Sequence, residues 1–199
     1  MLVREIMTSP AYSVQEGEPL EAAVKLMATA RVTGLPVLDE SGRVVGIISE
    51  ADLLKASLEP DPRAHMRVAP HHFAPMAATV GEVMTAHPHT VREDTDVAEV
   101  AQTFARTAWK SVPVVRGDVL LGVVSRSDVI RAIARPDAEI AAEIGRTLAE
   151  IGMQGWTVEV THGLVRITGT ASDRERAAVA SIAQSVIGVR RVMAPESDA

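Results

Sequence analysis

The fold is decided by a nine-residue stretch that occurs twice, as GIISEADLL at residues 46–54 and as GVVSRSDVI at residues 122–130. Two further blocks recur in the same order: VREIMT (3–8) returns as VGEVMT (80–85), and GLPVL (34–38) returns as SVPVV (111–115). The offset is 76 residues for the first pair of blocks and 77 for the other two. The second copy is therefore one residue shorter between its last two blocks. That stretch is a predicted turn, where a deletion is best tolerated. Three matched blocks indicate an internal duplication.

Both copies predict the element order β-α-β-β-α. Apolar residues at helical spacing predict the first helix of each copy; they are Leu20, Val24, Leu26 and Met27 in one and Val97, Val100, Ala101 and Phe104 in the other. Ser49 and Ser125 are placed to cap the closing helices. We expect the first copy at residues 1–58, a linker at 59–79 and the second copy at 80–135.

Composition limits the classes of protein that this chain can represent. It has 199 residues, of which 47% are hydrophobic and only 3% aromatic, so the core must be aliphatic. The absence of Cys excludes disulfides, thiolate metal sites and cysteine nucleophiles. A formal net charge of −6 argues against a general nucleic-acid binder. No signal peptide or membrane-spanning run is evident, which predicts a cytoplasmic protein.

The duplicated motifs resemble a tandem pair of CBS (cystathionine-β-synthase) domains over roughly residues 1–135. The motifs that carry the resemblance are Met7-Thr8 and Met84-Thr85, Leu35-Pro36-Val37 and Val112-Pro113-Val114, and the two Gly-x-x-Ser-x-x-Asp turns. By this resemblance the chain is expected to bind AMP, ADP, ATP or S-adenosylmethionine as a regulatory ligand and to form a homodimer.

The resemblance also implies which residues hold the ligand. A carboxylate one turn into a helix is able to accept two hydrogen bonds from a ribose diol, and the resemblance assigns this role to the pairs Ser49–Asp52 and Ser125–Asp128. The alternative is that each pair only caps its helix. The remaining residues implied for the site are Thr8, Pro10, Ala11, Gly34, Leu35, His87, His89, Ser111 and Val112.

The two sites are expected to differ in charge. Arg126 and Arg131 accompany the second Ser–Asp pair, with Lys110 upstream, whereas Glu50 replaces Arg126 in the first copy. An acid beside a phosphate is unfavourable, so we expect a phosphorylated nucleotide at the second site and an uncharged or cationic adenosine derivative, or no ligand, at the first. The alternative is that Glu50 and Arg126 are simply solvated helix-start residues.

A different module is predicted after Pro136. Its elements are an amphipathic helix at 137–151 (Ile140, Ile144, Leu148 and Ile151), a hairpin turning at His162-Gly163, a second helix at 174–187 and a strand at 189–192. This α-β-β-α-β order and the spacing of Val158, Val160, Gly163, Val165 and Gly169 resemble a BON domain, over roughly residues 137–194. Such domains are associated with phospholipid, but six Arg against nine Asp and Glu from 137 to 199 favour another partner. We expect Trp156 to pack in a core rather than anchor in a membrane.

No catalytic or metal-binding constellation is evident. The histidines at 65, 71, 72, 87 and 89 lack the regular spacing of a metal site. The predicted fold is therefore α+β, with two CBS repeats and a small BON domain. The predicted function is ligand-sensing regulation without enzymatic activity, with the BON domain as output. The alternative is a ligand-free dimerisation scaffold whose BON domain binds a protein or phospholipid partner.

Overall fold

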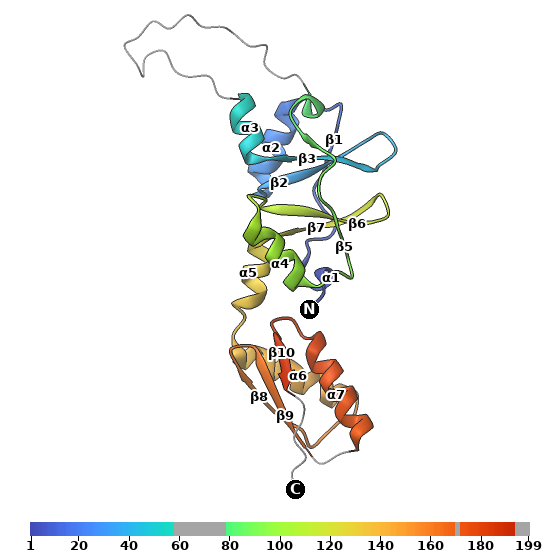
Figure 1. Ribbon diagram of the computed structural model, residues 1–199, viewed down its shortest axis with the longest axis vertical. Helices are drawn as coiled ribbons and strands as arrows, with labels where there is room; N and C mark the ends of the chain where they lie inside the picture. The colour runs from blue at the N-terminus through green and yellow to red at the C-terminus, as the bar shows by residue number, and fades with distance from the viewer. Residues whose placement is uncertain (58–78, 170–171, 194–199) are drawn as a thin grey trace, which may run out of the picture. The chain divides into compact units, whose positions relative to one another are not determined.

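The structure is a computed structural model, and the residues that it describes are 1–57, 79–169 and 172–193 (Figure 1). The described residues form two compact units. We call the part within Thr8–Glu93 and Ala108–Val124 the pocket unit, and the part within Met1–Met7, Asp94–Thr107 and Ser125–Ala199 the terminal unit. Apart from Thr79, the predicted linker at 59–79 lies outside the described residues, as do His65, His71 and His72.

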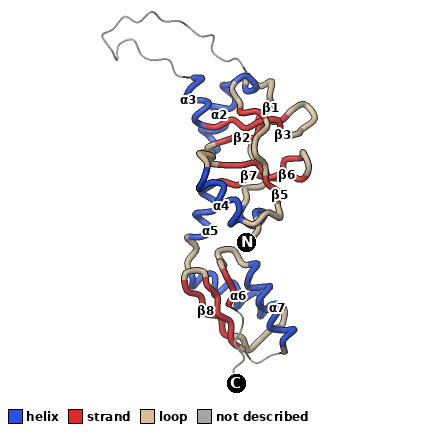
Figure 2. Tube along the Cα trace, viewed as in Figure 1, coloured by secondary structure: helices blue, strands red, loops and turns tan. Residues whose placement is uncertain are grey.

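The first sheet of the pocket unit has the strand order β1-β2-β3-β4. Its strands are β1 (Val14–Gln15), β2 (Gly34–Leu38), β3 (Val44–Ser49) and β4 (Thr85–Ala86). β1 is parallel to β2, whereas β2, β3 and β4 are antiparallel neighbours. Helix α2 (Leu20–Ala30) connects β1 to β2, and α3 (Glu50–Ser57) follows β3 directly, as Figure 2 shows. The first repeat therefore has the predicted β-α-β-β-α order.

Aliphatic side chains form the core of this sheet and its helices. Leu35 and Ile48 are fully buried and pack with Leu20 and Met27 of α2. Burying a side chain of this size contributes about 1.5–3 kcal/mol. Val24, one of the apolar residues whose spacing predicts this helix, is 39% exposed, because it lies beside the stripe formed by the buried residues of α2.

The second sheet of the pocket unit has the order β5-β6-β7. It contains β5 (Val91–Arg92), β6 (Ser111–Arg116) and β7 (Val119–Ser125), and a short 3₁₀ helix, η2 (Val80–Glu82), precedes β4. Between β6 and β7 the turn is only Gly117-Asp118, whereas residues 39–43 separate β2 from β3. The repeats thus differ in length at this turn, as predicted.

The longer turn is organised by one carboxylate. Asp39 accepts hydrogen bonds from the Ser41 hydroxyl and from the backbone N–H groups of Ser41 and Arg43. The Ser41 hydroxyl first, and then the backbone N–H and guanidinium of Arg43, hold the pKa of Asp39 well below its ordinary range.

The terminal unit contains the remaining helices of the repeats, α1 (Val3–Ile6), α4 (Val97–Arg106) and α5 (Arg126–Ile133). Both α1 and α4 contact α5. The second repeat therefore follows the chain order β5-α4-β6-β7-α5, the same as the first.

The C-terminal module of the terminal unit has the predicted α-β-β-α-β order. Its elements are α6 (Asp137–Glu150), β8 (Thr157–Thr161), β9 (Leu164–Thr168), α7 (Asp173–Ser185) and β10 (Arg191–Met193). β9 is the central strand, antiparallel to β8 and parallel to β10. His162 and Gly163 have φ of 51° and 72°, as a tight type I′ hairpin turn requires.

This module has its own aliphatic core. Ile140, Ile144 and Leu148 of α6 are buried with residues of β9 and α7, and Trp156 packs against them as expected. The helix predicted at 137–151 ends one residue earlier, at Glu150, and Ile151 is 52% exposed. The last helix begins one residue earlier and ends two residues earlier than expected, and β10 begins two residues later, at Arg191.

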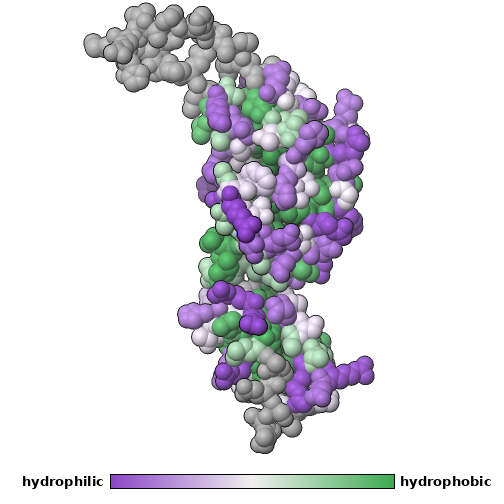
Figure 3. All heavy atoms as spheres, in the orientation of Figure 1, coloured by the Kyte–Doolittle hydropathy of each residue, from purple (hydrophilic) through white to green (hydrophobic). Residues whose placement is uncertain are grey.

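On the face drawn in Figure 3, hydrophilic and hydrophobic residues are interspersed. Within residues 1–57, 79–169 and 172–193, no helix combines the length and apolar character needed to cross a bilayer.

Candidate functional site

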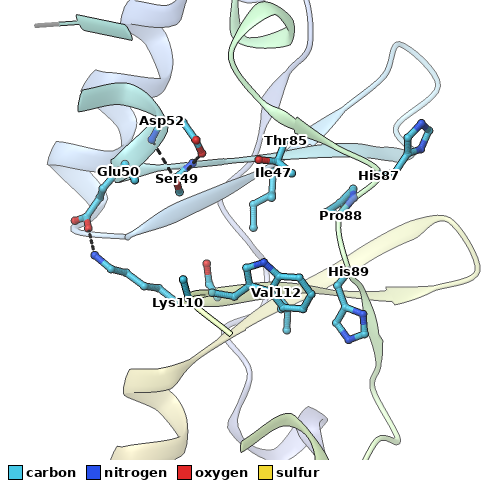
Figure 4. A pocket seen from close by; sticks show the side chains of 14 residues that line it. Ile47, Ser49, Glu50, Asp52, Thr85, His87, Pro88, His89, Lys110 and Val112 are labelled. Atoms are coloured by element: carbon cyan, nitrogen blue, oxygen red, sulfur yellow. Dashed lines mark hydrogen bonds and ion pairs between the residues drawn. The ribbon is translucent and has the colours of Figure 1, made fainter. Parts of the chain in front are cut away.

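A pocket of about 290 Å³ lies within the pocket unit (Figure 4). Three segments form its walls: the end of β3 with the first turn of α3, β4 with the residues after it, and the residues that lead into β6. The lining residues are Ile47, Ser49, Glu50, Ala51, Asp52, Thr85, His87, Pro88, His89, Ala108, Trp109, Lys110, Ser111 and Val112. The pocket thus combines the closing turn of the first repeat with the opening and middle segments of the second.

The first turn of α3 places Ser49 and Asp52 in this wall. The backbone N–H and hydroxyl of Ser49 donate to Asp52 Oδ2 at 3.0 and 2.5 Å, and the Asp52 N–H donates to Ser49 Oγ at 3.4 Å. This reciprocal cap satisfies donors that the start of a helix leaves unpaired. The capping role considered from the sequence is therefore present. Among the described residues, however, Asp52 Oδ1 has no hydrogen-bond partner, so one oxygen of the carboxylate is available to a ligand.

The Ser125–Asp128 pair of the second repeat has the same cap but no free oxygen. Ser125 donates to Asp128 Oδ2 from its backbone and hydroxyl at 2.8 and 2.7 Å, and Arg131 Nη1 donates to Oδ1 at 2.9 Å. Asp128 is also only 7% exposed. Asp128 and Arg131 line a separate pocket of about 450 Å³ in the terminal unit, together with Glu5, Ile6, Ala132, Arg135, Glu143 and Ile187.

The pocket of about 290 Å³ that Ser49 and Asp52 line is called the Asp52 pocket below, and its two ends differ in chemistry. At one end Lys110 Nζ lies 2.8 Å from Glu50 Oε2, and Figure 4 shows this ion pair beside Ser49 and Asp52. At the other end lie His87 and His89; the ring of His89 stacks on Trp109 with centroids 5.2 Å apart and planes at 20°. Between them, Figure 4 shows Ile47, Thr85 and Val112. The pocket therefore offers hydrogen bonds at one end and apolar and aromatic surface towards the other.

The predicted grouping of charges needs correction. Lys110, which the sequence associated with the second Ser–Asp pair, lines the pocket of the first. Arg126 donates to the carbonyl oxygens of Phe104 and Thr107 at 2.8 and 2.6 Å, so its guanidinium caps the C-terminus of α4. Arg131 is paired with Asp128. The charges expected to receive a phosphate at the second site are thus engaged within the protein or placed elsewhere.

Seven of the predicted ligand residues meet in the Asp52 pocket: Ser49, Asp52, His87, His89, Lys110, Ser111 and Val112. Thr8, Pro10, Ala11, Gly34 and Leu35 do not line it, and neither do Ser125, Arg126, Asp128 and Arg131. Leu35 is fully buried in the core. A Cβ at Gly34 would come within 2.8 Å of the hydroxyl oxygen of Ser111, which lines the pocket.

Several lining residues were not predicted from the sequence, chiefly Ile47, Thr85, Ala108 and Trp109. Their position next to predicted residues was the available signal. It is a weak one, because the side chains of neighbouring residues in a strand point to opposite faces, and the sequence does not show which of them lines a pocket. Among the described residues, no group of three or more His, Asp or Glu side chains is arranged to hold a metal ion. The prediction of no metal site stays a prediction, because three histidines lie outside the described residues.

Comparison with known families and proteins gives matches that span both repeats. The family model of the CBS domain matches residues 3–59 and 80–135. The protein CBSX2 of the chloroplast of Arabidopsis thaliana is 30% identical over 137 residues, which cover 61% of this chain and 58% of that protein. An uncharacterized protein of Methanocaldococcus jannaschii, MJ1404, is 31% identical over 133 residues, covering 66% of this chain and 32% of the relative. The match thus spans less than two thirds of the length of each of these relatives.

Two solved structures are similar in fold and carry adenosine compounds. A structure of CBSX2 in complex with AMP aligns with a TM-score of 0.54 at 29% identity, covering 66% of this chain and 94% of that one. The CBS domain pair of protein MJ0100, in complex with 5′-methylthioadenosine and S-adenosyl-L-methionine, aligns with a TM-score of 0.53 at 27% identity and the same coverage.

Proposed function

The chain belongs to the CBS domain family, and from this premise we propose that it is a regulatory protein that binds an adenosine-containing ligand and passes the binding event to its C-terminal module. The observation that carries the proposal is the Asp52 pocket. It combines a carboxylate with one free oxygen, at a helix N-terminus, with apolar and aromatic walls.

This arrangement suits a nucleoside. Asp52 Oδ1 and the Ser49 hydroxyl lie at the polar end, where a ribose diol finds hydrogen-bond acceptors. Ile47, Val112 and Trp109 supply the flat, apolar contact that a purine base requires. The similar structures that hold AMP, or 5′-methylthioadenosine with S-adenosyl-L-methionine, support the same class of ligand.

A second ligand site is proposed around Ser125 and Asp128. A ribose at Asp128 must displace Arg131 from Oδ1, so this site is expected to bind more weakly than the first unless the ligand also carries a phosphate for Arg131.

Transmission to the C-terminal module is proposed to run through α5. Asp128 and Arg131 lie on α5, and the chain continues into Arg135, which donates to the Ile187 carbonyl at 2.9 Å and pairs with Glu143. Asp137 then accepts hydrogen bonds from the backbone N–H groups of the β8–β9 turn. A movement of α5 would therefore be passed on to the module rather than absorbed by a loose linker.

We also propose that the module is a BON domain, that the protein is a cytoplasmic homodimer and that it is not an enzyme. The α-β-β-α-β order of the module supports the first point. Exposed apolar residues at equivalent positions of α3 and α5, Leu54 and Ile130, support the second, because such positions are suited to burial against another chain.

The test is calorimetric titration of the full chain with AMP, ATP and S-adenosylmethionine, in parallel with Asp52→Ala and Asp128→Ala. Saturable binding that Asp52→Ala abolishes supports the proposal and identifies the principal site. Glu93→Gln is the control, since its carboxylate pairs with Arg116 and does not line the pocket. If none of the compounds binds, the proposal is wrong and the ligand-free scaffold is favoured, with the C-terminal module binding a protein or phospholipid partner.

A further inference from the structure

Residue 50 and residue 126 occupy the same place in the two repeats but have different roles. Both begin the helix that follows the Gly-x-x-Ser turn. Arg126 turns to the end of α4, where it donates to two carbonyl oxygens. Glu50 instead reaches Lys110, 60 residues further along the chain. Of these two residues, therefore, only Glu50 at the start of α3 places a carboxylate in the lining of the Asp52 pocket, where it pairs with Lys110.

The Glu50–Lys110 ion pair belongs to the pocket lining and determines its charge. The two groups are 2.8 Å apart, with side chains 44% and 58% exposed. Leaving the histidines aside, the charged lining groups are two carboxylates, Glu50 and Asp52, and one ammonium, Lys110. The ammonium is already paired, so the polar end of the pocket has an excess of one negative charge.

A phosphate in this pocket meets two obstacles. It must take Lys110 away from Glu50, and it then leaves the Glu50 carboxylate unpaired beside the phosphate oxygens. An uncharged nucleoside leaves the ion pair intact and still has Asp52 Oδ1 and Ser49 for its ribose. A cationic substituent is favoured further by the excess negative charge.

Resting on the proposed function, we infer that the Asp52 pocket takes an adenosine compound without phosphate, uncharged or cationic at its 5′ substituent, and that the Glu50–Lys110 pair is the specificity-determining element. Glu50 excludes phosphate by occupying Lys110 and by its own charge. This specificity belongs to the Asp52 pocket alone, because the equivalent of Glu50 in the second repeat is an arginine bound to α4.

The experiment compares adenosine, AMP and S-adenosylmethionine by calorimetry in an Asp128→Ala background, so that only the Asp52 pocket titrates. We expect adenosine and S-adenosylmethionine to bind roughly 10-fold more tightly than AMP. Repulsion between the Glu50 carboxylate and a phosphate a few ångströms away, both partly exposed to water, weakens binding by about this factor. Glu50→Gln should raise the affinity for AMP about 10-fold and change that for adenosine less than about 2-fold. Lys110→Gln should weaken AMP further and leave adenosine nearly unchanged.

Two controls separate a local charge effect from other causes. Glu93→Gln makes the same change in net charge at an ion pair outside the pocket, and we expect it to leave the AMP-to-adenosine ratio unaltered. Raising the salt concentration from about 0.05 to about 0.5 M should reduce the discrimination in the parent protein, because screening acts on exposed charges.

The outcomes distinguish this inference from the proposed function. If adenosine and AMP bind equally well and Glu50→Gln leaves their ratio unchanged, the inference is overturned and the proposed function stands. If adenosine binding survives Asp52→Ala in the Asp128→Ala background, the ligand lies outside the Asp52 pocket and the inference is again overturned. If no adenosine compound binds the wild-type protein, the proposed function itself is wrong.

Discussion

Replacing Asp52 with Ala tests whether the carboxylate serves only the helix or also a ligand. The substitution removes both hydrogen bonds that Ser49 donates to Asp52 Oδ2. The loss of such a cap costs about 1 kcal/mol. For a chain of this size that lowers Tm by about 2–4 °C without any ligand. A purely structural role predicts this effect and nothing more.

A ligand role predicts a second, separable effect. At a ligand concentration 100 times Kd, the wild-type protein gains about 2.7 kcal/mol, which raises its Tm by roughly 5–11 °C. Asp52→Ala should lose this rise as well as the small ligand-free decrease. The assay is thermal unfolding followed by circular dichroism, with and without S-adenosylmethionine.

The chain offers a matched control in the C-terminal module. Ser172 and Glu175 form the same reciprocal cap at α7, with Ser172 donating to Glu175 Oε2 at 2.9 and 2.7 Å. Glu175→Ala should therefore cause a comparable small decrease in Tm and keep the whole ligand response. If Asp52→Ala also keeps the full response, the carboxylate is a cap only, and the assignment of the ribose to Asp52 is refuted.

The remaining predictions concern the C-terminal module. Ile144→Ala, which empties a fully buried position, should lower the free energy of unfolding by about 2–5 kcal/mol in urea denaturation; Ile151→Ala, at a half-exposed position just after the same helix, should change it by less than about 0.5 kcal/mol. Equal losses would contradict the observed packing. Backbone N–H groups of the β8–β9 turn, Gly163 first, lower the pKa of Asp137, so the stability that this carboxylate contributes is complete above about pH 4, its unfolded value, and is lost as the pH falls through the lower native pKa. Asp137→Asn should accordingly destabilise the protein at pH 7, and the difference should disappear in strong acid; urea titrations between pH 2 and 7 that showed a constant difference would disprove it. Gly169→Ala should shift the fluorescence of Trp156, because the new Cβ would lie 2.5 Å from the indole ring and force it to move. The emission spectrum is measured in a Trp109→Phe background, and an unaltered spectrum would contradict the expected displacement of the ring.

Much of the fold was predictable because the interactions that define it are local. The caps at Ser49 and Ser125 join residues three apart. The hairpin turn at His162-Gly163 depends on two adjacent residues that adopt positive φ. The helix predicted at 137–151 ends one residue early, and Ile151 is half-exposed. Val24 helps to predict its helix but is partly exposed, at the edge of the buried stripe. Periodicity predicts which face of a helix a side chain lies on, but not how far along that face the packed neighbouring element extends.

The sequence by itself determined the duplication, the element order of each repeat, the two Ser–Asp caps and seven of the residues that line the Asp52 pocket. Only the tertiary structure decided the partners of the charges. Lys110 pairs with Glu50 across 60 positions of the chain, and Arg126 binds carbonyl oxygens at the end of α4. The physical reason is that a long charged side chain pairs with a group that the fold brings close in space. That group belongs to the other repeat for Lys110 and to another helix of the same repeat for Arg126, and residue spacing along the chain reveals neither.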